Sequence, residues 1–261
     1  MTAILRTESG KHLRGTLALT GLLILLAAIL LVVFPSIQEE AEVFEEVYPE
    51  YLLALLGIEE LHSIEGFVGG YIFPFTWVLI AGIYVAYVSA GMISRDVRTR
   101  RMDLLLSNPV SRESVVLQKV AALWVPLVAL NVGLFVALFV GVQLLEESID
   151  VVALAMAHLL GVPYLLVCAG IGIVLSVVID RVETAQAVAL GLVFVLWLVD
   201  GLSKMDPDFE WVGEATPSRY YDPSAILVHE EYALADAGIL LAAFLVLLGV
   251  AVLVFTRRDL S

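Results

Sequence analysis

The sequence predicts an all-α membrane protein with six transmembrane helices. Its 261 residues are 61% hydrophobic and only 16% charged, and the mean hydropathy is +0.96. Six apolar runs approach or exceed the roughly 20 residues that a helix needs to cross the hydrocarbon core. We therefore expect one transmembrane domain over residues 1–261. Its spans are predicted at residues 16–34, 70–94, 120–145, 151–179, 184–202 and 235–255.

The first apolar run is predicted to be a retained span. Residues 16–34 are longer than the hydrophobic core of a typical signal peptide, and the sequence FPSIQEE that follows contains no small-residue cleavage site. Further along, the sequence IDRVET between the fourth and fifth runs is short enough to form only a tight hairpin, so those two helices should be antiparallel neighbours.

The basic residues predict which side of the membrane each loop occupies. Of the fourteen Lys and Arg residues, twelve precede span one, separate spans two and three or four and five, or follow span six. Cytoplasmic flanks retain positive charge, so both termini are expected in the cytoplasm and loops 35–69 and 203–234 outside. The outer loops are acidic. They are either a vestibule that collects cations or a solvated surface typical of a halophilic archaeon, which the pI of 4.6 fits.

No group of residues predicts an enzyme. The sequence HEEYA at His229 lacks the second histidine of a zinc-binding motif, and GLSK around Ser203 lacks the second glycine of a nucleophile elbow. Cys168 is expected to be a packing residue. His158 and Asn131 interrupt the spans, and each is expected to be satisfied by a neighbouring helix rather than to form a proton relay.

The chain also lacks a phosphate-binding loop of the form G-x-x-x-x-G-K-[ST]. Its Gly10-Lys11 pair is followed by His12, and Leu5 stands where the first glycine belongs. If the protein is driven by ATP, the nucleotide and its Mg²⁺ must therefore be bound by a separate subunit. No cofactor is expected on this chain.

A charged segment between spans two and three is the best candidate for a subunit contact. Residues 96–106 have the pattern of an amphipathic helix, which Ser107-Asn108-Pro109 should end. Ser111 is a candidate N-cap for a second helix running through Lys119 into span three, with Glu113 in its first turn. The alternative interpretation is a loop whose arginines contact anionic lipid.

At these residues the sequence resembles the permease subunits of ABC-2 type exporters, in particular the branch that includes the nitrous-oxide-reductase accessory permease. The resemblance rests on Asp96, on Leu104-Leu105-Leu106 and on Pro109-Val110-Ser111-Arg112, although Arg100-Arg101 occupies the family's Gly-Thr position. Three further stretches are similar to family features. They are YPEYLLALLGIEELHSIEGF, SRYYDPSAILVHEEY, where Asp222-Pro223 is a good helix start, and the terminal FTRRDL.

The resemblance implies a plasma-membrane exporter subunit that works by alternating access. It would bind an ABC ATPase and form a homodimer or heterodimer within the bilayer, with no nucleic-acid partner. Residues 3–15 would be an interfacial helix. A cytoplasmic coupling helix would contact the ATPase through Asp96, Arg98, Arg101, Asp103, Leu104, Leu105, Leu106, Pro109, Val110, Ser111 and Arg112. A non-transporting membrane scaffold and an ion-coupled carrier are the alternative functions. The substrate is left open, because Met92, Met102, Met156, Met205 and Cys168 form no recognisable copper-ligand set.

Overall fold

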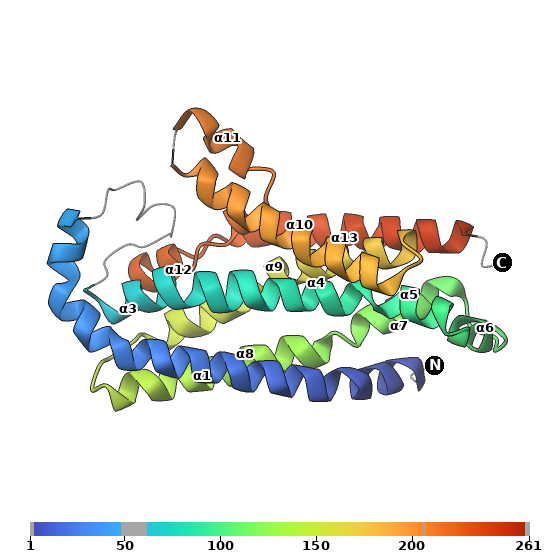
Figure 1. Cartoon of the computed structure of the whole chain (residues 1–261), viewed down its shortest axis with the longest axis horizontal. Coiled ribbons are helices and arrows are strands. Elements are labelled where there is room, and N and C mark those ends of the chain that lie inside the picture. The colour runs from blue at the N-terminus through green and yellow to red at the C-terminus, as the bar shows by residue number, and fades with distance from the viewer. Residues whose placement is uncertain (1–2, 48–61, 206, 259–261) are drawn as a thin grey trace.

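A computed structural model describes residues 3–47, 62–205 and 207–258, and every regular element in these ranges is a helix (Figure 1). Six helical segments are long and apolar enough to span a membrane, which confirms the predicted fold class. They are Ile4–Glu39, Ile64–Arg98, Arg112–Leu144, Val151–Val178, Val182–Ser203 and Leu234–Arg257. The family-like insertion in the first loop falls largely on residues 48–61, outside the described residues.

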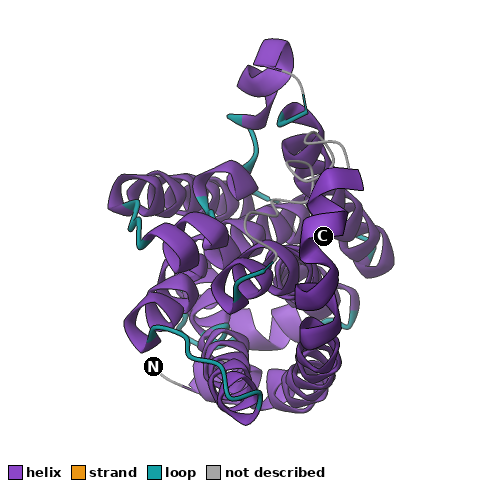
Figure 2. Cartoon of the chain, turned by 90° about the vertical axis from the view of Figure 1, so that its left-hand side faces the viewer, coloured by secondary structure: helices purple, strands orange, loops and turns teal. Residues whose placement is uncertain are grey.

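The fourth span, α9 (Val151–Val178), is the most deeply buried of the six. It packs against α4 (Gly82–Ala90), α8 (Trp124–Leu144), α10 (Val182–Ser203) and α13 (Leu234–Arg257). The first helix lies along α8 on the other side of the bundle (Figures 1 and 2). The first helix begins and α13 ends at the same end of the bundle, called here the terminal end; the opposite end is called the distal end (Figure 1).

Small residues allow α9 to approach its neighbours closely. A Cβ atom placed on Gly172 would lie 2.0 Å from the Ser89 hydroxyl oxygen and 2.3 Å from the Ala86 carbonyl oxygen of α4. A Cβ on Gly170 would lie 2.9 Å from the Leu247 side chain of α13. Close backbone contact of this kind is a main source of helix association in lipid, where the hydrophobic effect between helices is absent.

The second span begins earlier than predicted and is irregular in its first half. It starts with α3 (Ile64–Phe67) and continues through the π-helical segments η1 (Val68–Ile72) and η2 (Pro74–Ala81) before α4. Pro74 has no N–H to donate, and π-helical turns are common at functional sites. The Tyr164 hydroxyl of α9 donates a hydrogen bond to the Val78 carbonyl, at 2.8 Å, and so holds this segment.

The first helix differs from the prediction at both ends. Helix α1 runs without interruption over Ala3–Val47, so residues 3–15 are not a separate interfacial helix and the span does not stop at Phe34. Nothing in residues 3–34 breaks a helix. Pro35 lies inside α1, where a proline kinks a helix more readily than it ends one, and the distal part of α1 turns away from the bundle (Figure 1).

The predicted outer loop at residues 203–234 is folded. It contains η3 (Pro207–Phe209), α11 (Glu210–Gly213), η4 (Pro217–Tyr220) and α12 (Pro223–His229). Asp222 caps α12 as expected, because its Oδ1 accepts hydrogen bonds from the backbone N–H groups of Ser224, at 2.9 Å, and Ala225, at 3.1 Å. The loop thereby covers the distal end of the second span.

We expect Gly172→Val to destabilise the protein by about 1–3 kcal/mol, because the backbone of α4 cannot make room for the new side chain. Gly191→Val is the matched control, since a Cβ on Gly191 meets no atom within 4 Å. Thermal unfolding in detergent measures both variants. Equal melting temperatures would contradict the close α4–α9 packing.

Candidate functional site: the connecting segment

The charged segment between spans two and three lies at the terminal end of the bundle (Figure 1). It consists of α5 (Met92–Arg98), α6 (Arg101–Leu106) and α7 (Arg112–Ala121), and we call these three helices the connecting segment. The single helix predicted over residues 96–106 is wrong. The backbone turns at Arg100, whose φ of 55° lies in the left-handed region that favours glycine. Arg100 occupies the position at which the family that the sequence resembles has glycine.

The predicted stop and restart after α6 are confirmed. The side chains of Ser107 and Asn108 both donate to the Leu104 carbonyl, at 2.9 Å, and close the end of α6. The Ser111 hydroxyl oxygen accepts the Ser114 N–H at 3.2 Å and caps α7. Helix α7 ends at Ala121, and a turn precedes α8 because Pro126 cannot donate the hydrogen bond that would continue the helix.

A buried ion cluster holds the inner side of the connecting segment. Lys119 of α7 is fully buried, and its Nζ lies 2.7 Å from Asp96 Oδ2 of α5 and 3.2 Å from Glu8 Oε1 of α1. The same Nζ donates to the Met92 carbonyl at 3.0 Å, and Lys11 lies 2.5 Å from Glu8 Oε1. We call Glu8, Lys11, Asp96 and Lys119 the Lys119 cluster. It joins three helices that are distant in sequence.

The fourth span also anchors the connecting segment. The Ser176 hydroxyl oxygen of α9 accepts hydrogen bonds from the backbone N–H groups of Ile93, at 2.9 Å, and Ser94, at 3.1 Å. Sequence reasoning missed Ser176 and Glu8 and counted Lys119 only as a flanking charge. The one available signal was a single acid, Glu8, among the basic residues that precede span one.

Two of the arginines that the resemblance assigns to ATPase contact also make contacts within this chain. Arg112 donates to the carbonyls of Phe255 and Thr256, both at 3.3 Å, and Arg258, at 2.6 Å, and so caps the end of α13. Arg98 forms an ion pair with Glu183 at the start of α10. With the Asp96 pair, these contacts tie the segment to α1, α10 and α13.

The outer side of the connecting segment is exposed and partly apolar. Leu104 is 70% exposed, while Leu105, Leu106 and Val110 are half-buried. Arg101, Asp103, Pro109 and Ser111 are also exposed. Among the residues that the resemblance singles out, Asp96 is therefore buried, whereas Arg101, Asp103, Leu104, Pro109 and Ser111 are exposed.

Two grooves flank Ile4 and Leu105 on this outer side. The first, of about 480 Å³, is lined by Ile4, Thr7, Glu8, Lys11, Asp96, Arg101, Leu104 and Leu105, and we call it the Asp96 groove. The second, of about 680 Å³, is lined by Ile4, Leu105, Asn108, Pro109, Val110, Ser111, Ser114 and Gln118, and we call it the Pro109 groove. Both combine apolar and polar lining, as protein-binding surfaces do.

The other polar groups that the sequence singled out inside the spans bond to their own helices and not to neighbouring ones, and the buried Nε2 of His158 has no hydrogen-bond partner among the described residues. The His158 Nδ1 lies 2.9 Å from the Leu154 carbonyl of its own helix, and Asn131 donates to the Leu127 carbonyl at 2.7 Å. Cys168 is buried, as expected. Within residues 3–47, 62–205 and 207–258, no three His, Cys, Asp or Glu side chains are grouped to hold a metal ion.

Six long apolar helices indicate a multi-pass membrane protein. A family model described as "ABC-2 family transporter protein" matches residues 3–206, and the chain belongs to this family of membrane transport proteins. A search of curated proteins finds no match to the chain.

We expect Lys119→Met to cost about 3–5 kcal/mol of stability, because it leaves Asp96 buried without its counter-charge and leaves Glu8 with Lys11 alone. Lys11→Met is the control. It removes a partly exposed lysine from the same cluster and should cost less than about 1 kcal/mol. Thermal unfolding measures both, and adding Asp96→Asn to Lys119→Met should recover part of the loss. Equal losses for the two lysine variants would refute the ion-pair assignment.

Proposed function

We propose that this chain is the permease subunit of an ATP-driven exporter and that a separate ABC ATPase docks on the outer side of the connecting segment. One observation carries the proposal. The same short segment exposes Leu104 at the Asp96 groove and is fixed on its other side by the Lys119 cluster. An exposed leucine on a rigidly held helix suits a contact that must transmit force.

The alternative role for this segment is contact with anionic lipid. The exposed Arg100 and Arg101 could make such a contact, but Arg98 and Arg112 are engaged by Glu183 and by the end of α13. The Asp96 groove also has acids beside its basic residues, a mixed lining that suits a protein surface better than an anionic headgroup layer. These features favour a protein partner.

The proposed mechanism follows from the anchors. Closure of an ATPase dimer after ATP binding would push on α6. The Lys119 cluster would pass the movement to α1, Ser176 would pass it to α9, and Arg112 would pass it to α13. A displacement of α6 would then reorient the packed spans together. As a result, the translocation path would open alternately to the two sides of the membrane. ATP and Mg²⁺ would be bound by the ATPase.

The remaining features belong to the same proposal. The acting unit would be a homodimer or a heterodimer of permease chains in the cell membrane, exporting a substrate away from the ATPase side. A place in the nitrous-oxide-reductase branch and a halophilic archaeal source are supported by the motifs at Asp96 to Arg112 and by the acidic composition. A scaffold would bind a partner without transport, and an ion-coupled carrier would transport without ATP.

We expect the double variant Leu104→Ser and Leu105→Ser to lose both ATPase association and ATP-driven transport while keeping its melting temperature, because both side chains line the docking grooves. Leu117→Ser is the matched control, since Leu117 is 48% exposed on α7 and lines neither groove. The measurement is recovery of a P-loop ATPase with the tagged permease from its own membranes.

The docking proposal would be overturned if the double variant recovered as much ATPase as the control and transported equally well. Recovery of no ATPase with the unaltered chain, together with transport that does not depend on ATP, would instead overturn the exporter proposal itself.

A further inference from the structure

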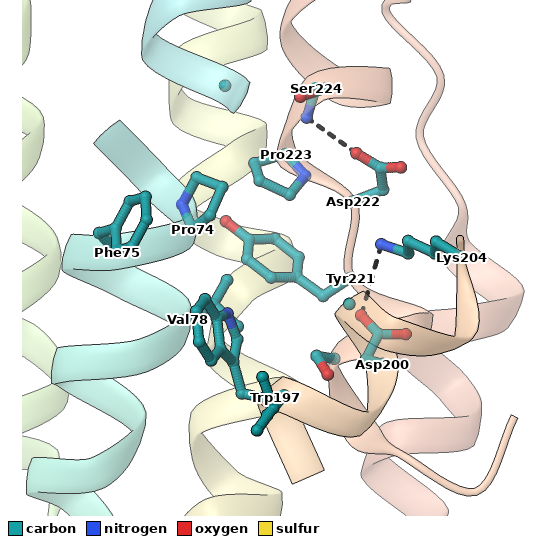
Figure 3. A pocket seen from close by; sticks show the side chains of 14 residues that line it. Pro74, Phe75, Val78, Trp197, Asp200, Lys204, Tyr221, Asp222, Pro223 and Ser224 are labelled. Atoms are coloured by element: carbon teal, nitrogen blue, oxygen red, sulfur yellow. Dashed lines mark hydrogen bonds and ion pairs between the residues drawn. The ribbon is translucent and has the colours of Figure 1, made fainter. Parts of the chain in front are cut away.

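A cavity at the distal end of the bundle is separate from the connecting segment (Figure 3). It has a volume of about 130 Å³ and lies between the π-helical part of the second span, the end of α10 and the start of α12. Aromatic, proline and charged side chains from these three elements face one another across it (Figure 3). Trp197, Phe75, Tyr221, Asp200 and Lys204 are the lining residues that decide its chemistry.

The cavity contains a carboxylate whose charge is incompletely balanced. The Asp200 side chain is 93% buried (7% exposed), and its only ion-pair partner in the described part of the chain is Lys204, with Nζ at 3.3 Å from Oδ2. The Asp200 Oδ1 atom is enclosed and has no hydrogen-bond partner among the described residues. A buried carboxylate normally has several close partners, so a second positive charge beside Oδ2 would stabilise Asp200.

The walls of the cavity suit an alkylated cation. The rings of Phe75 and Trp197 have centroids 5.9 Å apart at an angle of 57°, and they form one side. Tyr221 contributes its ring, since its hydroxyl donates to the Ala157 carbonyl at 2.8 Å. Burial, followed by the charge of Asp222, raises the pKa of Tyr221 well above its ordinary value, so the hydroxyl stays a donor. Aromatic faces beside a carboxylate are typical of ammonium recognition.

The overall charge of the lining excludes an anion as the preferred ligand. Asp200 and Asp222 are its acids and Lys204 is its one base. A neighbouring cavity of about 350 Å³ shares Lys204, Tyr221 and Asp222 and adds two acids, Glu231 and Asp236, against one base, Arg219. A cation approaching from the distal end therefore meets a negative potential before it reaches Asp200.

We propose that this cavity binds a small organic cation, with its ammonium group beside Asp200 and its alkyl groups against Trp197 and Phe75. Lys204 is 30% exposed and can swing into water, so the ligand would replace it as the partner of Asp200. A bare metal ion fits less well, because the described residues provide no group of three metal-ligating side chains. The proposal concerns binding alone and does not depend on the ATPase.

The test uses the full chain in nanodiscs and three probes: choline, its neutral carbon isostere 3,3-dimethylbutan-1-ol, and acetate. Isothermal titration measures affinity, and Trp197 provides a fluorescence signal that Trp197→Phe should remove. We expect saturable choline binding at least about tenfold tighter than that of the isostere, because only choline carries the charge, and no saturable acetate binding.

Two variants with opposite expected effects on choline binding separate a change in the site from a loss of folding, because a misfolded protein could not bind choline more tightly. Asp200→Asn should abolish the preference for choline over the isostere, whereas Lys204→Met should strengthen choline binding because it removes the competing cation. Glu147→Gln is the control, since it removes one carboxylate from the loop between α8 and α9 without lining the cavity. Equal affinity for choline and its isostere, no binding of choline, or weaker binding by Lys204→Met would each overturn the proposal.

Discussion

The ion pair between Lys119 and Asp96 is the interaction on which the terminal end of this protein depends. Moving charges out of water costs several kcal/mol per ion, and that cost is offset only when every partner is in place. Here Lys119 of α7 needs Asp96 and the Met92 carbonyl, both of α5, together with Glu8 of α1. The cluster therefore restricts α1, α5 and α7 to one relative arrangement.

The rest of the bundle extends this constraint away from the cluster. Polar contacts extend the constraint to neighbouring helices, because Ser176 fixes α5 to α9 and Arg112 fixes α7 to α13. Close packing carries it along the spans, because Gly172 brings the backbones of α4 and α9 together. Interfaces packed in this way shift between discrete arrangements rather than deform continuously. The connecting segment is thus held to three of the other helices, α1, α9 and α13.

Local features of this structure could be predicted from the sequence, and long-range ones could not. The six spans follow from hydrophobic length, and the caps at Ser111 and Asp222 follow from residues within one helical turn. Asp96 is buried against Lys119 of another helix, and Lys119 also pairs with Glu8, which lies far away in the chain. Likewise, the distal cavity brings together three elements whose proximity no local pattern encodes. The continuation of α1 through Pro35 was missed because proline marks a helix end only on average.

The central claim is that the Lys119 cluster makes α1 and the connecting segment move as one body. Spin labels on the exposed positions Arg6 and Thr99, after replacement of each by cysteine, measure this directly in the ATPase complex, while the buried Cys168 should escape labelling. We predict one narrow distance distribution that is the same with and without trapped nucleotide, and a broad one when Lys119→Met is added. A distance that shifts on nucleotide trapping in the unaltered cluster would contradict the account.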